Sequence, residues 1–381
     1  MAWMKLTRRH VGLRAVAVAL VGCALARGAD DLVYVGANTL RDSRGIYGYR
    51  FDPRNGKLRP LGLEAEVSNP TFLVVHPDRR YLYAVGQDPA GTVSAFLIDP
   101  KSGKLTLINR VPSKGDSPNH LSLDREGRWL AVANHDSGSV AILPLRKDGG
   151  LGAAAAVVQQ SGSSVDAQAQ AGPHPHCVVF SPDNRFLLVA DLGADKIFVY
   201  RFDAQTGALS PADTPSKAVA PGAGVRHLLF HPNGKVLYAI NELASTVTTY
   251  AWNAAAGGLT ELQTVPSRPP QFPGATTAAE IAINHAATML YASNRGSDCL
   301  ALLVIDPVLF TLSALEYTPL VGQTPRHFAL DPTGHFLVVA NQGSDSLTVY
   351  TVHPHTGQIR PVGRPITGVS LPTSVVFVPP E

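Results

Sequence analysis

Six ionisable side chains stand where short apolar segments of this sequence begin or have just ended. Histidine and glutamate exchange protons near neutral pH when their surroundings shift the pKa, and arginine binds anionic groups through paired hydrogen bonds. Each residue alone is explained as a solvated surface group or one half of an ion pair. Six at equivalent places, in a chain with only 16% charged residues, favour a ligand site. The six are His176, Arg226, Glu242, Glu280, Arg295 and Arg326.

The elements that must position these residues form a repeat. "CVVFSPDNRFLLVADL", "HLLFHPNGKVLYAINE" and "HFALDPTGHFLVVANQ" each read as an apolar strand, a short turn and a second apolar strand. Proline and glycine or asparagine suit such turns. A third and a fourth strand follow, as in "KIFVYRFD" and "GALSPA". The residues that end the second strands are spaced by roughly 50 residues: Gly86, Asn134, Asp191, Asn241, Asn294 and Asn341.

One incomplete copy lies at each end of the repeat. "DLVYVGAN" at 31–38 is a second strand without a first, and "LPTSVVFV" at 371–378 is a first strand without a second. Joined, they complete a seventh copy. A solenoid would carry capping repeats instead of complementary halves. The sequence therefore predicts an all-β, seven-bladed propeller of four-stranded antiparallel blades over residues 31–379, its ring closed by the N- and C-terminal strands.

In a propeller the first strand of each blade lines the central channel, and the second strand runs antiparallel beside it. The starts of first strands and the ends of second strands therefore meet on one face. We expect the six charged residues to gather at that mouth, with long connections at 149–172 and 265–278 around it. First strands start at Thr71, Asn119, His176, Arg226, Glu280, Arg326 and Thr373, and second strands are followed by Asn38, Gln87, His135, Leu192, Glu242, Arg295 and Gln342.

Residues 1–26 have a basic start, an apolar run and a small-residue end, as in a secretory signal. Cys23 stands in a lipobox-like "LVGC", which predicts a lipid anchor, whereas cleavage after Ala26 would discard it. We expect an exported protein, periplasmic or anchored at the cell envelope, without a membrane-spanning segment in the mature chain. The segment holds four of the basic residues and no acidic ones, so the net charge changes from +3 to −1 without it. Such a chain gives no support to nucleic-acid binding.

The sequence gives little support for a metal or cofactor. Cys177 and Cys299 fall in predicted strands and are expected to be buried and inert. His174 and His176 are expected to point in diverging directions, which disfavours zinc. The asparagines that end second strands suit turns, and the alternative is that their oxygens converge on Ca²⁺. We therefore predict no metal and no cofactor.

Across essentially the whole mature chain, the blades resemble those of the seven-bladed propeller lactonases, which include bacterial 6-phosphogluconolactonases and carboxy-cis,cis-muconate cyclase. The resemblance is carried by "PHCVVFSPDNRFLLVADLGADKIFVY", "VRHLLFHPNGKVLYAINEL", "AEIAINHAATMLYASNRG" and "PRHFALDPTGHFLVVANQGSDSLTVY". It implies a catalytic cluster of His176 in "PHC", Arg226 in "GVRH", Glu242 in "INEL" and Arg295 in "SNRG".

The implied activity is hydrolysis of a sugar-acid lactone by a monomer that needs only this small-molecule partner. Glu242 or His176 would act as base, and Arg226 or Arg295 would hold the oxyanion. Arg326 suits a carboxylate or phosphate, and Glu280 would orient an arginine. We place His227, Asn134 and Asn294 with Arg326 and Glu280 in substrate binding. The alternatives are a non-enzymatic exported propeller of "YVTN"-type repeats, a muconate cyclase-like lactonising enzyme, and a calcium-dependent mechanism like that of six-bladed lactonases.

Overall fold

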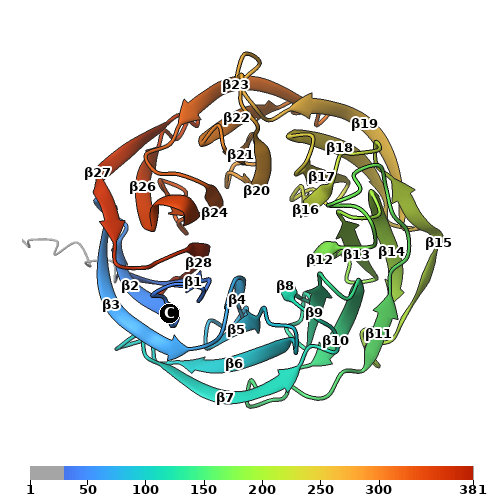
Figure 1. Ribbon diagram of the computed structural model, residues 1–381, viewed down its shortest axis with the longest axis horizontal. Helices are drawn as coiled ribbons and strands as arrows, with labels where there is room; N and C mark the ends of the chain where they lie inside the picture. The colour runs from blue at the N-terminus through green and yellow to red at the C-terminus, as the bar shows by residue number, and fades with distance from the viewer. Residues whose placement is uncertain (1–29, 381) are drawn as a thin grey trace, which may run out of the picture.

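Seven antiparallel sheets, each of four strands, are arranged in a ring around a central channel (Figure 1). The computed structural model describes residues 30–380, so the expected export signal at 1–26, with Cys23, lies outside the described residues. Each sheet is one predicted repeat. In six of the seven sheets the strands run outward from the channel in chain order, and in the seventh the C-terminal strand is innermost. The predicted propeller is confirmed.

We number the blades from the first one that is continuous in the chain. Blade 1 consists of β4 (Leu73–Val75), β5 (Tyr81–Gly86), β6 (Thr92–Ile98) and β7 (Leu105–Pro112). Blade 2 consists of β8 (Pro118–Leu123), β9 (Trp129–Asn134), β10 (Ser139–Pro144) and β11 (Ala156–Gln159). Blade 3 consists of β12 (Pro175–Phe180), β13 (Phe186–Asp191), β14 (Lys196–Phe202) and β15 (Leu209–Ala218). Blade 4 consists of β16 (Val225–Phe230), β17 (Val236–Asn241), β18 (Thr246–Asn253) and β19 (Gly258–Pro266). Blade 5 consists of β20 (Thr277–Ile283), β21 (Met289–Arg295), β22 (Cys299–Ile305) and β23 (Leu312–Pro319). Blade 6 consists of β24 (Pro325–Leu330), β25 (Phe336–Asn341), β26 (Ser346–Val352) and β27 (Ile359–Thr367), with a 3-10 turn, η1 (Gln342–Ser344), after β25.

Blade 7 closes the ring. Its innermost strand is the C-terminal β28 (Pro372–Val378), followed outward by β1 (Asp31–Ala37), β2 (Gly45–Asp52) and β3 (Lys57–Glu66). β28 pairs antiparallel with β1 from Leu32↔Val378 to Gly36↔Ser374. The two incomplete copies seen in the sequence therefore form one sheet, in which β1 is paired on both edges, with β28 and with β2.

The second strand of each blade is the most buried element, because blades cover it on both faces. β5, β9, β13, β17 and β25 are buried along their whole length. Tyrosines on these strands also tie neighbouring blades together. The hydroxyl groups of Tyr34, Tyr83 and Tyr291 donate to the carbonyl oxygens of Gly103, Gly149 and Gly357 at 2.7, 3.0 and 2.8 Å, each in the next blade. The ring is thus a rigid support for whatever its channel presents.

A β-bulge recurs where the innermost strands begin. The pairing of β12 with β13 skips a residue between Pro175 and Cys177, and that of β16 with β17 skips one between Val225 and His227. A bulge re-aims the extra side chain, so consecutive residues need not alternate between faces. The residues at the bulges are Asn119, His176, Arg226, Arg326 and Thr373, with Ala279 and Glu280 in β20.

Cys177 and Cys299 are free and buried, as expected. Burial raises the pKa of Cys177 to about 12, so its thiol stays protonated and unreactive at neutral pH. Among residues 30–380, no helix has the length and apolar character required to cross a membrane.

Candidate functional site

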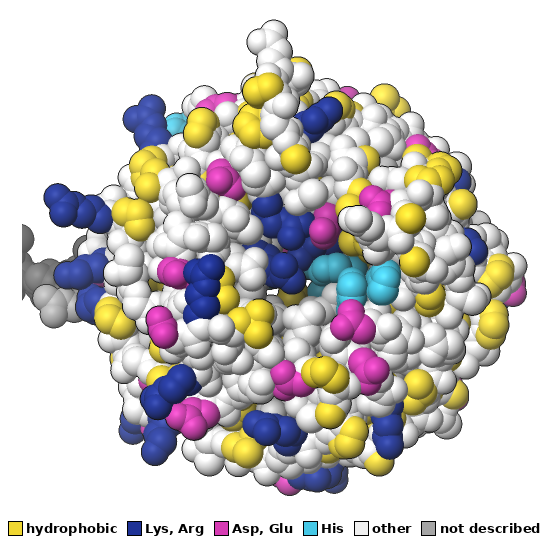
Figure 2. Space-filling view, in the orientation of Figure 1, with side chains coloured by type: hydrophobic (Ala, Val, Ile, Leu, Met, Phe, Trp, Pro, Cys, Tyr) yellow, Lys and Arg dark blue, Asp and Glu magenta, His cyan; other side chains and the backbone are white. Residues whose placement is uncertain are grey.

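The innermost strands start, and the second strands end, around a hollow at one end of the channel, which we call the mouth cavity. Figure 2 shows basic, acidic and histidine side chains gathered at this central opening. The cavity has a volume of about 430 Å³. Side chains from blades 1 to 6 line it: Gln87, Asn119, His135, Gln168, Ala169, His174, His176, Leu192, Glu242, Leu243, Arg295 and Arg326.

Glu242 joins two arginines at the wall of the mouth cavity. Its Oε2 lies 2.8 Å from Arg226 Nε, and its Oε1 lies 2.9 Å from Arg295 Nη2. Burial alone would raise the pKa of Glu242, but Arg295 and Arg226 outweigh it and hold the pKa below its ordinary value. Glu242 is therefore a stably ionised carboxylate with both oxygens occupied.

The two arginines differ in access to the cavity. The side chain of Arg226 is 3% exposed, and its Nη1 donates to the carbonyl oxygen of Ala279 at 2.6 Å. Arg295 lines the cavity and is 15% exposed. Arg226 thus holds Glu242 from the side away from the cavity, whereas Arg295 can contact a ligand in the cavity.

Arg326 is a cation without a protein anion. Within residues 30–380 no carboxylate lies within 4.0 Å of its guanidinium group. Burial, with Arg226 and Arg295 nearby, lowers its pKa to about 9, so it remains charged at neutral pH. It stands between the mouth cavity and a second cavity of about 270 Å³, and Gln87 also lines both. A half-buried cation in this position favours an anionic ligand.

His176 faces the mouth cavity as a neutral imidazole. It is 7% exposed, and its Nδ1 has no hydrogen-bond partner in the described part of the chain. Burial, together with Arg226 and His227, holds its pKa well below the ordinary value. His176 is therefore able to accept a proton or to donate a hydrogen bond.

Glu280 and His227 lie deeper in the channel and do not line the mouth cavity. Glu280 Oε1 lies 3.2 Å from His227 Nδ1, and Glu280 Oε2 lies 3.1 Å from His327 Nε2. His227 contacts Arg226, with Nε2 3.1 Å from Nη1. Glu280 thus interacts with two histidines rather than orienting an arginine by direct contact, because the bulge in β20 turns it into the channel.

Asn134 and Asn294 are not brought to the cavity. Both are 0% exposed, and their side chains bond mainly to the connections that enter their blades from the preceding ones. Asn134 Nδ2 donates to Ser113 O and Ser139 Oγ, while Asn294 is bonded at both ends to Ser267. They tie second strands to neighbouring turns, in line with the turn role and not with substrate binding.

Two histidines that line the mouth cavity, His135 and His174, were not among the site residues predicted from the sequence. His174 lines the same cavity as His176, contrary to the diverging directions expected, because the bulge after Pro175 changes the alternation. His135 follows β9 at the offset that Glu242 has after β17. Its ring lies 4.6 Å from that of His174 and 5.8 Å from that of His176.

The long connection before β12 reaches the mouth cavity, as expected. Gln168 and Ala169 line the cavity, and the turn that carries them is closed by Asp166 Oδ1, which accepts from both backbone N–H groups at 2.9 Å. Gln170 Nε2 donates to Leu192 O at 2.9 Å. The loop at 265–278 contributes no lining residue to this cavity.

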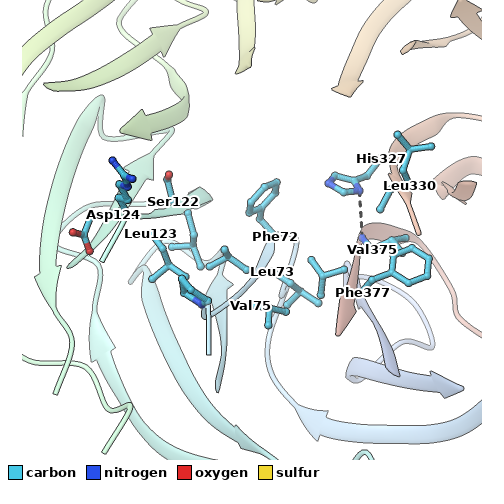
Figure 3. A pocket seen from close by; sticks show the side chains of 16 residues that line it. Phe72, Leu73, Val75, Ser122, Leu123, Asp124, His327, Leu330, Val375 and Phe377 are labelled. Atoms are coloured by element: carbon cyan, nitrogen blue, oxygen red, sulfur yellow. Dashed lines mark hydrogen bonds between the residues drawn. The ribbon is translucent and has the colours of Figure 1, made fainter. Parts of the chain in front are cut away.

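A further hollow, larger than the mouth cavity at about 700 Å³, lies at the other end of the channel and is mostly apolar. Figure 3 shows Phe72, Val375, Phe377 and His327 around it, with His327 Nδ1 accepting from the backbone N–H of Val375 at 3.3 Å. Phe72 packs against His120, His227 and His327 at centroid distances of 4.1, 6.1 and 5.8 Å. These rings separate the apolar hollow from the charged mouth cavity.

The chain is similar to known proteins over nearly its whole length. The family described as "Lactonase, 7-bladed beta-propeller" matches residues 32–377. A 6-phosphogluconolactonase of Bacillus subtilis is 32% identical over 346 residues, which is 91% of this chain and 97% of that protein. One from Formosa agariphila is 32% identical, covering 86% and 94%. The structure of the periplasmic gluconolactonase of Pseudomonas aeruginosa superposes with a TM-score of 0.86 at 35% identity, over 93% of this chain and 100% of that one.

Proposed function

We propose that this chain, which belongs to the seven-bladed β-propeller lactonase family, hydrolyses a sugar-acid lactone in its mouth cavity. The observation that carries the proposal is the convergence of Arg295, Arg326 and a neutral His176 on one cavity of about 430 Å³. A volume of this order suits a small ligand. A binding protein without catalysis would not need uncharged imidazoles beside guanidinium groups. The proposed catalytic residues are His176, Arg226, Glu242 and Arg295.

Arg295 is best placed to stabilise the oxyanion that forms when water adds to the lactone carbonyl. It is the arginine of the Glu242 pair that lines the cavity, and Glu242 fixes its guanidinium at 2.9 Å. Preorganised donors of this kind lower the barrier because they need no reorientation during the reaction. Arg226 acts through Glu242, since its own guanidinium is buried behind the carboxylate.

Proton transfer belongs to the imidazoles rather than to Glu242. A carboxylate whose two oxygens each face a guanidinium, and whose pKa is lowered by them, is a weak base at neutral pH. His176 is neutral and has no competing carboxylate partner. It is therefore suited to a hydrogen bond with the ring oxygen that leaves from the carbonyl carbon.

The substrate carries an anionic group that binds Arg326. The relatives include a protein named 6-phosphogluconolactonase and one named gluconolactonase, so both a phosphorylated and an uncharged sugar lactone are candidate substrates. The half-buried guanidinium of Arg326, which has no carboxylate partner among residues 30–380, favours the anionic one. Export of this chain is part of the proposal, supported by the signal-like residues 1–26 and by the periplasmic relative.

The activity is tested by adding purified protein to a panel of aldonolactones and their phosphates, with each spontaneous hydrolysis rate subtracted. We expect at least one lactone to be opened at a rate that rises with enzyme concentration. Arg295→Ala should lower kcat by about 10²-fold, as expected for loss of an oxyanion donor. Arg364→Ala, which alters an exposed arginine on β27, is the matched control and should retain full activity. No acceleration of any lactone, or an unchanged rate in Arg295→Ala, would contradict the proposal.

Arg326→Gln tests the anion site separately. We expect kcat/KM for a phosphorylated lactone to fall by about 10- to 100-fold, because a charge-assisted contact is lost. For the matching uncharged lactone the fall should be several times smaller. The measurement is the ratio of the two kcat/KM values in wild type, Arg326→Gln and Arg364→Gln. Equal losses for both substrates would show that Arg326 does not select for charge.

A further inference from the structure

We propose that His135, held by Asp136, is the general base that activates the attacking water. The inference rests on the proposed lactone hydrolysis and assigns a catalytic group that neither the sequence nor the comparisons provide.

His135 occupies a mouth position. It directly follows β9, as Glu242 directly follows β17, so ring symmetry brings both to the same rim. It lines the mouth cavity together with His176, Arg295 and Arg326. Its side chain is 26% exposed, which makes it more accessible to water than the buried His176.

A carboxylate sets the tautomer of His135. Nδ1 lies 2.7 Å from Asp136 Oδ1, and Asp136 Oδ2 accepts a hydrogen bond from the hydroxyl of Ser117. The Nδ1–H donates to Asp136, so Nε2 keeps its lone pair. This is the arrangement in which an acid residue orients an imidazole and stabilises its protonated form.

Three further contacts hold the imidazole in place. The ring of His174 stacks on it at 4.6 Å with 17° between the planes. His174 Nδ1 lies 3.1 Å from the carbonyl oxygen of His135, and the backbone N–H of His135 donates to Ser117 O at 3.1 Å. A base fixed in this way loses little entropy when it meets its substrate.

The charges around His135 leave it neutral and able to accept a proton. Burial lowers its pKa, Asp136 and Glu242 oppose that effect, and His174 adds to it, so the pKa lies below the ordinary value. The other titratable or charged groups that line the same cavity are His176, Arg295 and Arg326.

The other bases at the mouth are less suited to activate water. His176 has no carboxylate partner, and its Nδ1 is buried. Glu242 has both oxygens occupied by arginines. His227 and His327 lie in the channel against Glu280, away from the cavity lining. His135 alone among these groups combines a carboxylate partner with a place in the cavity wall.

The step balances without any co-reactant. His135 Nε2 takes a proton from water as the water oxygen bonds to the carbonyl carbon, and Arg295 stabilises the resulting oxyanion. The bond from that carbon to the ring oxygen then breaks with its electron pair going to the ring oxygen. The imidazolium returns its proton to that oxygen, which yields a hydroxy acid whose carboxyl proton is lost to solvent.

A metal ion is the competing interpretation of the same residues. His135, Asp136 and His174 offer ligand atoms within 4.8 Å of one another. However, two rings only 17° from parallel direct their in-plane lone pairs side by side rather than at a common point. The Oδ1 of Asp136 is also already engaged by His135. The geometry therefore favours the base.

The test compares His135→Gln, Asp136→Asn and wild type on the best lactone, across pH 5 to 8. We expect His135→Gln to lower kcat by about 10²- to 10³-fold with little change in KM. In wild type, kcat/KM should rise with pH and level off once His135 is neutral. Asp136→Asn should move that midpoint to lower pH, because the carboxylate that favours the imidazolium is gone. His335→Gln, an exposed histidine on the opposite face, should behave as wild type.

Two further measurements keep the outcome decisive. His135→Ala should regain part of its activity when free imidazole is added, and binding of an aldonolactam analogue should remain as tight as in wild type.

An active wild type with an unaffected His135→Gln, or an unmoved midpoint in Asp136→Asn, would overturn the base while leaving the lactonase intact. Activity lost with EDTA and restored by Zn²⁺ would overturn it in favour of a metal. A wild type inactive on every lactone would overturn the proposed function itself.

Discussion

Replacing Glu242 by alanine is expected to lower kcat/KM by about 10³-fold and to cost about 3–5 kcal/mol of the free energy of unfolding. Both effects have one cause. The Glu242 side chain is only 18% exposed, and its carboxylate lies 2.8 Å from Arg226 and 2.9 Å from Arg295. Without it the mouth cavity would hold two partly or fully buried guanidinium groups beside the unpaired Arg326. The loss in rate follows because Arg295 would no longer be fixed.

The matched control is an exposed pair of the same chemistry. Glu66 lies 3.3 Å from Arg44, with side chains 70% and 66% exposed. Glu66→Ala should change stability by about 0–1 kcal/mol, as surface ion pairs do, and leave the activity unchanged. Urea unfolding at pH 7 and lactone hydrolysis would be measured for both variants. A Glu242→Ala protein as stable as Glu66→Ala would show that the buried pairing is not what holds the arginines.

A double variant separates stability from catalysis. Arg226→Met removes the most buried of the charges that Glu242 neutralises. In Arg226→Met with Glu242→Leu, part of the stability lost in either single variant should return, because no unpaired charge remains between those two positions. The activity should stay low, since Arg295 still lacks its partner. Recovery of both together would mean that Glu242 acts on catalysis only through folding.

The ring was predictable because the evidence for it is redundant. Each blade repeats a strand–turn–strand pattern, and the two incomplete copies at 31–38 and 371–378 fit together only if the chain closes on itself. The pairing of β1 with β28 is the result. The repeat also explains why Arg226 and Arg295 meet at one carboxylate, since they lie in the neighbouring blades 4 and 5. Equivalent offsets in a ring are equivalent positions in space.

The directions in which individual side chains point could not be predicted from the sequence, because they depend on the bulges. Strict alternation would put Arg226 and His227 on opposite faces of β16. The extra residue between Val225 and His227 instead lets Arg226 reach Glu242 while His227 faces Glu280 in the channel. No residue type marks such a bulge in this sequence. The same irregularity places His174 and His176 in one cavity.

The substrate-binding role predicted for Asn134 and Asn294 does not agree with their positions, because neither side chain lines the mouth cavity. A shift of one residue at the end of a strand turns the side chain from the mouth into the sheet, where it bonds to neighbouring serines. His135, one residue after Asn134, takes the mouth position. The repeat offset that singled out Glu242 also contained His135, and it was the usable signal.

Acid should unfold this protein over a range set by its channel histidines. His120, His176 and His227 are buried and His327 is 12% exposed, and removal from water is the main cause of their lowered pKa values. Three of them accept a hydrogen bond at the unprotonated nitrogen. His120 Nδ1 accepts from Val178 N–H, His227 Nε2 from Arg226, and His327 Nδ1 from Val375 N–H. Protonation would set two donors against each other at each of these contacts.

The direction in which stability changes with pH follows from the numbers of protons bound by the folded and unfolded states. A histidine whose folded pKa is lowered binds fewer protons in the folded than in the unfolded state, so stability rises with pH and is complete above the unfolded pKa. For His327, whose pKa falls from 6.5 to about 4, stability is lost as pH falls through that window. The full loss is about 3 kcal/mol for this residue. Four carboxyl groups whose pKa values burial raises act in the opposite sense: Asp31, Glu64, Asp191 and Glu280. The histidines with lowered pKa values number five, because His135 adds to the four in the channel.

The measurement is the urea unfolding free energy at pH steps from 7.5 to 4.5. We expect it to fall steeply below pH 6.5, with a slope of about 1.4 kcal/mol per pH unit for each proton taken up on unfolding. His327→Gln should reduce that slope, since one of the linked protons is removed, whereas the exposed His335→Gln should not. A flat profile between pH 7 and 5 would mean that the folded and unfolded states bind equal numbers of protons in this range, so that the channel histidines do not have lowered pKa values. The uncharged imidazoles invoked for catalysis at the mouth would then lose their electrostatic basis.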